Sequence, residues 1–325
     1  MSKPNLLVVL PRDHYVLHNF EGLREFANVH VGVDAETLDR FGPDADILVY
    51  SGFVGGIPFK PVWERTKHLK WVHTLSAGVE SALIPELVNS PVPLTNARGV
   101  FAPSLAEFVV LAMLYFYKRV RRLVESQRAH KWDNFLVDWL RGKTMGVVGY
   151  GEIGRESARL AKALGVKIYA IRRNPERSQN DPIVDRLFST TELHQMLAEV
   201  DVVLAAAPLT PETKHVLGKA AFAVMKPSAI VINVGRGPVV DEAALIQALQ
   251  KKQIAGAALD VFEAEPLSKD SPLWDMENVL ISPHCTDRTT NPDWLDLSAQ
   301  CFVDNFYRYI KGEPLKNVVD KKAGY

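Results

Sequence analysis

The chain has 325 residues, 47% of them hydrophobic, and its 38 lysine and arginine residues balance its 38 aspartate and glutamate residues. This length is enough for two domains with substantial cores. A net charge of zero argues against binding to nucleic acid or to a membrane surface. The longest apolar stretch, Leu105 to Tyr117, is too short to span a bilayer.

Only two cysteines are present, Cys285 and Cys301, which argues against a disulfide framework and favours a reducing compartment. The N-terminal residues pass directly into a strand-like run and show no signal-peptide cleavage site. The sequence contains neither a C-x-x-C pair nor an H-E-x-x-H motif, so we expect no metal site. Together these features predict a cytoplasmic protein.

The first 98 residues predict a small α/β unit with its own sheet. The expected strands are Leu6–Leu10, Val29–Val33, Ile47–Ser51, Trp71–Leu75 and Leu94–Thr95. After the fourth strand, the small residues Ala77 and Gly78 would leave backbone amides exposed at the carboxyl edge of the sheet, where ligands bind in open α/β sheets. An ordinary strand-to-helix turn is the alternative interpretation of this loop.

A long helix is predicted to begin near Pro103. Ser104 and Glu107 have the spacing of a capping box. Residues 108–117 are apolar nearly all round, which predicts a helix buried between domains or subunits. The basic run Lys118–Arg122 that follows is interpreted as a solvated helix end.

The central feature is a short apolar run, Met145–Val148, that opens into G-x-G-x-x-G. Gly149 allows a tight turn, Gly151 lets a phosphate approach the backbone, and Gly154 lets the next helix pack close to the strand. That helix is predicted over Glu152–Leu164 and is followed by a strand over Lys167–Ile171, as a dinucleotide-binding unit requires. Its expected buried face consists of Ile153, Ala158, Leu160, Ala161 and Leu164.

The two residues after the second strand of this unit, Arg172 and Arg173, bear on the choice of cofactor. In NAD-binding units an acidic residue usually stands there and hydrogen-bonds the ribose. A guanidinium instead pairs with a 2′-phosphate through two hydrogen bonds. The sequence therefore predicts NADP(H) rather than NAD, although two solvated arginines in a turn would give the same pattern.

Four further apolar runs, over residues 201–206, 229–234, 256–261 and 279–282, have the character of strands buried on both faces of a parallel sheet. Polar residues follow them: Arg236, Asp260, Glu265 and His284 are expected to converge at the carboxyl edge. A last helix is predicted over residues 293–311. Its aromatic residues are interpreted as core rather than as a ligand cage: Phe302, Phe306, Tyr307 and Tyr309.

Three of these residues suit hydride transfer between a nicotinamide and a 2-oxo acid. The planar fork of Arg236 can hold the carboxylate and carbonyl oxygens together. His284 can supply the proton, and Glu265 beside it would favour the charged imidazole. Each residue alone has an ordinary structural explanation, but their placement at successive strand ends favours a catalytic set.

With these motifs the chain resembles the D-isomer-specific 2-hydroxyacid dehydrogenases over nearly its whole length. The resemblance rests on Gly149–Gly154, Pro208–Thr213, Asn233–Gly237, Leu259–Pro266 and Ser282–His284. It implies that Arg236 binds and polarises the substrate, that His284 is the acid/base and that Glu265 tunes it. It also implies that the Ala77 and Gly78 amides bind the substrate carboxylate. The cofactor-binding residues it implies are Gly149, Tyr150, Gly151, Glu152, Ile153, Gly154, Arg172, Arg173, Pro208, Thr213, Val234 and Asp260.

The same resemblance implies two doubly wound parallel-sheet domains. A Rossmann cofactor domain (residues 99–289), through which the protein would form a homodimer, is inserted into a flavodoxin-like substrate domain (residues 1–98 and 290–325). The active site would be the cleft between them, and its closing would exclude water.

Arg172 resembles the NADPH-preferring glyoxylate/hydroxypyruvate reductase branch of the family. The leading hypothesis is therefore NADPH-dependent reduction of small 2-oxo acids to D-2-hydroxy acids. Two alternatives stay open: a reductase of branched or aromatic 2-oxo acids, with Phe53 lining its pocket, and a nucleotide-sensing scaffold similar to corepressors of this fold. The sequence Cys285-Thr286-Asp287 after His284 departs from the small residues and glycine of many members and bears on substrate fit.

Overall fold

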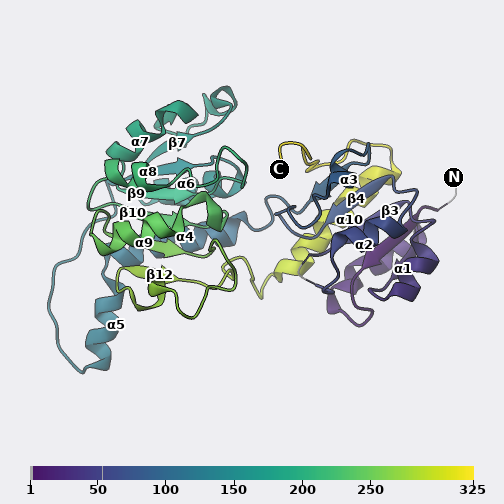
Figure 1. Ribbon diagram of the computed structural model, residues 1–325, viewed down its shortest axis with the longest axis horizontal. Coiled ribbons are helices and arrows are strands. Elements are labelled where there is room, and N and C mark those ends of the chain that lie inside the picture. The colour runs from purple at the N-terminus through teal and green to yellow at the C-terminus, as the bar shows by residue number, and fades with distance from the viewer. Residues whose placement is uncertain (1–2, 53) are drawn as a thin grey trace. The chain divides into compact units, whose positions relative to one another are not determined.

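The computed structural model describes residues 3–52 and 54–325, without the side chains of residues 175 and 177. The chain forms two compact units (Figure 1). Unit 1 comprises residues 1–101 and 288–325, and unit 2 comprises residues 102–287. Phe53, which the sequence placed beside a substrate pocket, lies outside the described residues.

Unit 1 is built on a five-stranded parallel sheet with the order β2-β1-β3-β4-β5. The strands are β1 (Asn5–Val9), β2 (Asn28–Val31), β3 (Ile47–Tyr50), β4 (Trp71–Thr74) and β5 (Leu94–Asn96). This order is that of the flavodoxin-like fold, in which the chain winds away from the first strand in both directions. The predicted flavodoxin-like architecture of this part of the chain is confirmed.

Both faces of this sheet are covered, because side chains alternate along each strand. Leu6 and Val8 of β1 pack on one face with η1 (Tyr15–Glu25) and α10 (Trp294–Ile310). Leu7 and Val9 pack on the other face with α1 (Ala35–Phe41), α2 (Phe59–Arg65) and α3 (Pro85–Val88). Phe302 and Phe306 of α10 are fully buried, so they belong to the core, as predicted.

Unit 2 is built on a seven-stranded parallel sheet with the order β12-β11-β10-β9-β6-β7-β8. This is the doubly wound order of a Rossmann fold, extended by one strand. The strands are β6 (Thr144–Val148), β7 (Lys167–Ile171), β8 (Arg186–Phe188), β9 (Val202–Ala205), β10 (Ile230–Asn233), β11 (Gly256–Leu259) and β12 (Val279–Ile281). All seven strands are short. The central strands β9, β10 and β11 are fully buried, which explains why their sequences are nearly continuous apolar runs.

The helices of unit 2 lie on both faces of its sheet (Figure 1). One face is packed by residues of α7 (Leu193–Glu199), α8 (Lys219–Val224) and α9 (Glu242–Gln250). The pair formed by α4 (Ala102–Tyr117) and α6 (Glu152–Ala163) packs helix against helix. The 3-10 turns are η2 (Pro175–Ser178), η3 (Thr190–Glu192), η4 (Gly237–Val239) and η5 (Pro272–Asp275).

Two details of the α4–α6 pair differ from the sequence prediction. Ser104 is no N-cap, because α4 already begins at Ala102 and its first turn tolerates Pro103; the Ser104 hydroxyl instead donates to the Thr286 carbonyl oxygen. Leu164 is 39% exposed and Ile153 and Leu160 are only half-buried, because the buried face of α6 is made of small residues: Gly154, Ser157, Ala158 and Ala161.

The basic run after α4 also differs from its prediction as a simple helix end. Arg119 adopts a left-handed conformation with a φ of 53°, which breaks the helix. A new helix, α5 (Val120–Arg128), then begins, and residues 129–140 follow without regular structure. In Figure 1, α5 and this segment extend away from the sheet of unit 2. We call residues 120–140 the arm. In addition, Leu111 on α4 is 56% exposed in the single chain.

Among the helices that the structure describes, none combines the length and the apolar character needed to cross a membrane.

Candidate active site

The loop after β6 has the geometry of a dinucleotide-binding turn. Gly149 has a φ of 96°, and a Cβ there would lie 2.4 Å from the backbone of Ala207, so only glycine fits. A Cβ at Gly154 would lie 2.5 Å from the Gly149 carbonyl oxygen, which shows how closely α6 approaches the loop. At Gly151 a Cβ would meet nothing within 4 Å, so this position faces open space at the start of α6. The three glycines therefore fit the backbone approach of a pyrophosphate to a helix N-terminus.

Tyr150 and Glu152–Ile153 complete this loop. The Tyr150 ring is buried, and its hydroxyl donates to Asp181 Oδ2 at 3.2 Å. Burial and the neighbouring Asp181 carboxylate raise the pKa of Tyr150 well above its ordinary range, so it stays a neutral hydrogen-bond donor. Glu152 occupies the first turn of α6 and is exposed, while Ile153 is half-buried.

The two arginines after β7 lie beside this loop at the carboxyl edge of the sheet. Arg172 is half-buried, and its Nη1 donates to the Ser178 hydroxyl at 2.7 Å. Arg173 is exposed, and its Nη2 lies 3.4 Å from Glu212 Oε2. The strand before them, β7, pairs directly with β6, so the glycine loop and the arginines occupy neighbouring strand ends.

The segment after β9 is held by its own hydroxyl groups. Thr213 Oγ1 donates to the Pro208 carbonyl oxygen at 2.6 Å and accepts from the Thr210 amide at 2.8 Å. Val234, after β10, is buried and its amide donates to the Ala205 carbonyl oxygen. These bonds fix the backbone after β9 and β10. The segment after β9 lies against the glycine loop, because a Cβ at Gly149 would meet the backbone of Ala207.

His284 and Glu265 form a hydrogen-bonded pair. His284 Nδ1 lies 2.7 Å from Glu265 Oε2, and the two side chains are 32% and 35% exposed. An ionised carboxylate can only accept, so Nδ1 carries a hydrogen and Nε2 is the nitrogen that can exchange a proton with a ligand. The other Glu265 oxygen, Oε1, accepts from the Phe262 amide at 3.0 Å, which fixes the carboxylate. His284 has a φ of 51°, a conformation uncommon for histidine and typical of constrained functional positions.

Arg236 lies on a turn that touches the loop carrying Glu265. The Asn233 side chain organises this turn, because it donates to the Arg236 carbonyl oxygen and accepts from the Gly235 amide. A Cβ at Gly237 would lie 1.8 Å from the Phe262 carbonyl oxygen, so the turns after β10 and β11 are in direct contact. The half-buried Arg236 guanidinium donates to the Gly235 carbonyl oxygen at 2.8 Å through Nη1.

Asp260 is 1% exposed and is committed to the segment after His284. Its Oδ1 accepts from the Cys285 and Thr286 amides at 3.2 and 3.4 Å, and its Oδ2 accepts from the Thr286 hydroxyl at 2.7 Å. The residues that depart from the family pattern, Cys285 and Thr286, are thus the ones that anchor the His284 turn. The hydroxyl of Thr286 has a defined structural use in this chain.

Ala77 and Gly78 lie in unit 1, in the loop after β4. Their carbonyl oxygens are both occupied: the Asn96 amide donates to the first and the Ser76 hydroxyl to the second, each at 2.6 Å. For the backbone amides of Ala77 and Gly78, no acceptor is found among residues 3–52 and 54–325. The loop is therefore held by its carbonyl groups, which is compatible with amides that bind a carboxylate.

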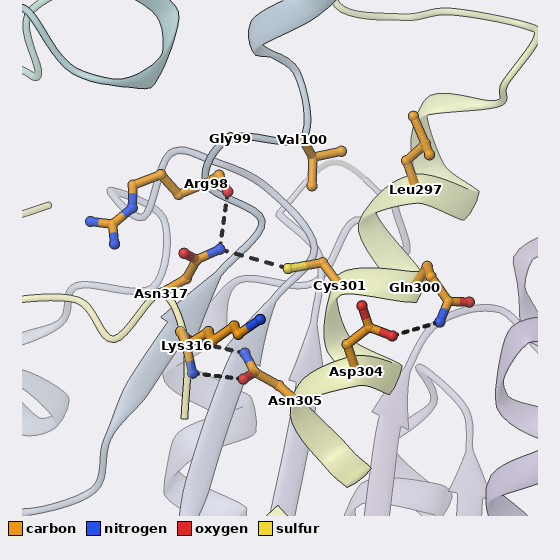
Figure 2. A pocket seen from close by; sticks show the side chains of 10 residues that line it. All are labelled: Arg98, Gly99, Val100, Leu297, Gln300, Cys301, Asp304, Asn305, Lys316 and Asn317. Atoms are coloured by element: carbon orange, nitrogen blue, oxygen red, sulfur yellow. Dashed lines mark hydrogen bonds between the residues drawn. The ribbon is translucent and has the colours of Figure 1, made fainter. Parts of the chain in front are cut away.

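A pocket of about 370 Å³ lies in unit 1 and contains none of the predicted site residues (Figure 2). It lies between α10 and the segments at residues 98–100 and 316–317. Asn305 clamps the backbone of Lys316 with two hydrogen bonds, and Asn317 donates to the Arg98 carbonyl oxygen and to Cys301 Sγ. These bonds fasten the C-terminal segment to α10, so the pocket walls have a structural role.

Sequence reasoning missed several side chains that contact the predicted site residues, among them Asn96, Ser178, Asp181 and Glu212. Ser178 ends the short 3-10 turn η2 after β7 and Asp181 follows it, in a stretch where spacing carries no signal for a contact. Glu212 was noticed only as part of the motif Pro208–Thr213. Within the described part of the chain, no three histidine, cysteine, aspartate or glutamate side chains gather as metal ligands would.

Comparison with known proteins gives consistent matches. Residues 110–286 match the family model for the "D-isomer specific 2-hydroxyacid dehydrogenase, NAD binding domain". The chain is 35% identical to glyoxylate/hydroxypyruvate reductase B of Salmonella heidelberg, over 99% of each chain. It is similar to the NADPH-dependent glyoxylate/hydroxypyruvate reductase of Sinorhizobium meliloti, solved with NADP and sulfate, with 26% identity, a TM-score of 0.83 and coverage of 99% and 100% of the two chains. A D-isomer specific 2-hydroxyacid dehydrogenase from Xanthobacter autotrophicus, solved with NADPH, matches with 28% identity and a TM-score of 0.84 over the whole of both chains.

Proposed function

We propose that this chain, which belongs to the D-isomer specific 2-hydroxyacid dehydrogenases, uses NADPH to reduce small 2-oxo acids of the glyoxylate and hydroxypyruvate type to D-2-hydroxy acids. The observation that carries the proposal is the His284–Glu265 pair at 2.7 Å, beside the turn of Arg236 and on the same sheet edge as the glycine loop. The relative from Salmonella, 35% identical over its whole length, is named for both substrates and supports their choice.

The cofactor would be held by the loop Gly149–Gly154, by Arg172 and Arg173, and by the backbone at Pro208, Thr213, Val234 and Asp260. When bound, NADPH supplies the hydride that reaches the carbonyl carbon. The open space above Gly151 leaves room for the pyrophosphate at the N-terminus of α6. Glu152 and Ile153 provide the first turn of that helix, whose free amides would bind the phosphate.

The substrate would be held by Arg236, together with the amides of Ala77 and Gly78. A guanidinium presents a rigid fork of donors, so Arg236 can bind the carboxylate and polarise the carbonyl oxygen at once. The backbone amides would bind the remaining carboxylate charge.

His284 would deliver the proton to the carbonyl oxygen as the hydride arrives at carbon. Because Nδ1 is engaged with Glu265, the proton comes from Nε2. Glu265 would keep the ring in one orientation and tautomer, and the Phe262 amide in turn fixes Glu265.

The preference for NADPH follows from Arg172. A carboxylate at this position would repel the 2′-phosphate, whereas the guanidinium pairs with it. We therefore expect Arg172→Asp to raise the dissociation constant of NADPH by about 10- to 100-fold, the scale of a lost charge-assisted hydrogen bond. The constant for NADH should change by less than about 3-fold, as measured by fluorescence titration of both nucleotides.

Lys251→Asp is the matched control, because it changes the net charge equally at an exposed position after α9. It should leave both constants unchanged. Equal losses of NADPH and NADH in Arg172→Asp would refute the assignment of the 2′-phosphate site.

We propose that the chain forms a homodimer through unit 2, in which the arm contacts the second subunit. The arm carries six large apolar side chains that are solvent-exposed in one chain, and the three most exposed are Trp132 at 98%, Leu136 at 87% and Trp139 at 70%. The arm is nevertheless ordered, because Arg122 makes two hydrogen bonds to Asp133 and stacks over Phe135 within it. It is fastened to the rest of unit 2 by Arg121, whose Nη1 donates to the Met276 carbonyl oxygen at 3.0 Å. An ordered segment with such exposed residues is typical of a subunit interface.

Sedimentation velocity at micromolar concentration is expected to give about twice the 36.2 kDa mass of the chain. Trp132→Asp should shift the protein toward monomer, because it places a charge in an apolar interface. Lys131→Asp, next to it, introduces the same side chain without removing an aromatic group and should shift the equilibrium less. A wild-type chain that sediments as a monomer would contradict the proposed dimer.

A further inference from the structure

The two arginines after β7 are tethered in different ways. Arg172 donates to a neutral group, the hydroxyl of Ser178, at 2.7 Å. Arg173 faces an anion instead, with its Nη2 3.4 Å from Glu212 Oε2. If both guanidinium groups serve the same phosphate, these tethers have different consequences: one leaves the positive charge uncompensated, and the other partly cancels it.

Ser178 is held firmly enough to position Arg172. It is 4% exposed, and its carbonyl oxygen accepts from the Asp181 amide. Asp181 Oδ2 in turn accepts from Arg155 Nε at 2.8 Å and from the Tyr150 hydroxyl. Burial opposes the charge on Asp181, but the hydrogen bond from Arg155 and its neighbours lowers the pKa of this carboxyl below its ordinary value. The segment carrying Ser178 is therefore fastened to the glycine loop and to α6.

The position of Arg172 is thus linked to the glycine loop through successive hydrogen bonds, of which the one between Asp181 and Ser178 joins backbone groups and the others involve side chains. A guanidinium has five N–H donors, so the bond to Ser178 leaves donors for a phosphate. Fixing the long side chain in advance also reduces the conformational entropy that binding would remove.

Glu212, the carboxylate that faces Arg173, is also held in place. Its Oε2 accepts from the Thr210 hydroxyl at 2.7 Å, within the segment that Thr213 fixes to Pro208. The hydrogen bond from Thr210, a backbone hydrogen bond and the charge of Arg173 lower the pKa of Glu212, so the carboxylate is ionised at neutral pH. A 2′-phosphate bound by Arg173 would be a second anion on the guanidinium that Glu212 already faces, and two anions close to one guanidinium repel each other.

Building on the proposed use of NADPH, we infer that Ser178 and Glu212 set the preference for the 2′-phosphate in opposite directions. Ser178 is a positioning residue that holds Arg172 ready for the phosphate. Glu212 competes with the phosphate for Arg173 and limits the affinity for NADPH, which keeps release of the oxidised cofactor possible. Neither residue affects the binding of NADH, which has no phosphate at this position.

The two substitutions have effects of opposite sign. Ser178→Ala should raise the dissociation constant of NADPH by about 2- to 10-fold, the scale of one hydrogen bond. Ser178→Thr, which keeps the hydroxyl, should restore most of the affinity. Glu212→Gln should lower the constant by about 2- to 5-fold, because an exposed ion pair is weak and screened by solvent. The constant for NADH should stay within about 1.5-fold in all three variants, which is small against the expected range.

The test is a fluorescence titration of the full chain with NADPH and with NADH, repeated by competition with 2′,5′-ADP and with 5′-AMP. The adenosine fragments isolate the 2′-phosphate, because they differ only in that group. Glu199→Gln is the matched control for Glu212→Gln, since it removes another exposed ion pair, with Arg186, from the same unit. The inference is supported if Ser178→Ala raises and Glu212→Gln lowers the dissociation constants of both NADPH and 2′,5′-ADP, while those of NADH and 5′-AMP stay unchanged.

The failure of the inference can be told apart from the failure of the proposed function. If Arg172→Asp weakens NADPH selectively but Ser178→Ala and Glu212→Gln leave the ratio of NADPH to NADH affinity unchanged, the inference alone is overturned. The same holds if both shift the ratio in one direction. If Arg172→Asp weakens NADH and NADPH equally, the proposed phosphate site is wrong and the inference falls with it.

Discussion

Replacing His284 by alanine is expected to lower kcat/KM for 2-oxo acid reduction by about 10²- to 10⁴-fold, the usual contribution of a general acid. The substitution removes the imidazole that lies 2.7 Å from Glu265 and the Nε2 proton that would reach the carbonyl oxygen. NADPH binding should stay within about 2-fold of wild type, because the glycine loop and the arginines lie on other strand ends. Steady-state rates and a cofactor titration measure the two effects separately.

A second variant guards against a purely structural explanation. His284 has a φ of 51°, a conformation that asparagine adopts more readily than alanine. His284→Asn therefore preserves the turn better, but an amide cannot act as a proton donor at neutral pH. It should lose as much activity as the alanine variant while melting near the wild-type temperature. Near-native turnover in either variant would refute the role of His284.

Arg236→Lys is expected to lower kcat/KM by about 10²- to 10³-fold, although it keeps the positive charge. Lysine is a point charge and cannot engage the carboxylate and the carbonyl oxygen with one planar fork. Loss of the carboxylate contact should raise KM, and loss of the contact that strengthens as the carbonyl is reduced should lower kcat. Saturation kinetics with glyoxylate resolve the two parameters.

Arg186→Lys serves as the matched control. Arg186 lies on β8, where it pairs with Glu199 and stacks over Phe188, remote in the strand order from β10 and β12. It should leave kcat and KM unchanged. If Arg236→Lys raised KM with an unaltered kcat, Arg236 would only bind the substrate and would not polarise it.

Much of the fold was predictable because buried parallel strands carry few polar residues. The strands β7 and β6 were located within one residue by their apolar runs and by the glycines between them. Strand β8 was missed, since it has only three residues and begins with Arg186. The start of α4 was also located within one residue, but the capping pattern at Ser104 was wrong, because Pro103 and Ser104 already lie inside the first helical turn.

The candidate site was predictable in part for a related reason. Residues that end neighbouring strands meet at one edge of the sheet, so Glu265 and His284 could be paired from the sequence alone. The membership in the family, predicted from motifs in order, is confirmed by a relative 35% identical over the whole chain. The roles of the individual residues stay predictions.

Contacts made by irregular segments could not be read in this way. Nothing in the spacing of Arg172 and Ser178 distinguishes a buried hydrogen bond from two solvated side chains. The same holds for Asp260, whose carboxylate anchors Cys285 and Thr286 across a loop. The solvent exposure of the apolar side chains of the arm likewise could not be predicted, because the sequence does not show that the helix breaks at Arg119.

The most direct test of the central claim is the rate of NADPH oxidation, compared with that of NADH, by the wild-type chain. The substrates are glyoxylate, hydroxypyruvate, pyruvate, and one branched and one aromatic 2-oxo acid. We predict that turnover is faster with NADPH than with NADH and is highest with glyoxylate or hydroxypyruvate. The product from hydroxypyruvate should be the D-enantiomer. Tight NADPH binding without turnover of any of these acids would contradict the proposed reductase and favour a nucleotide-sensing role.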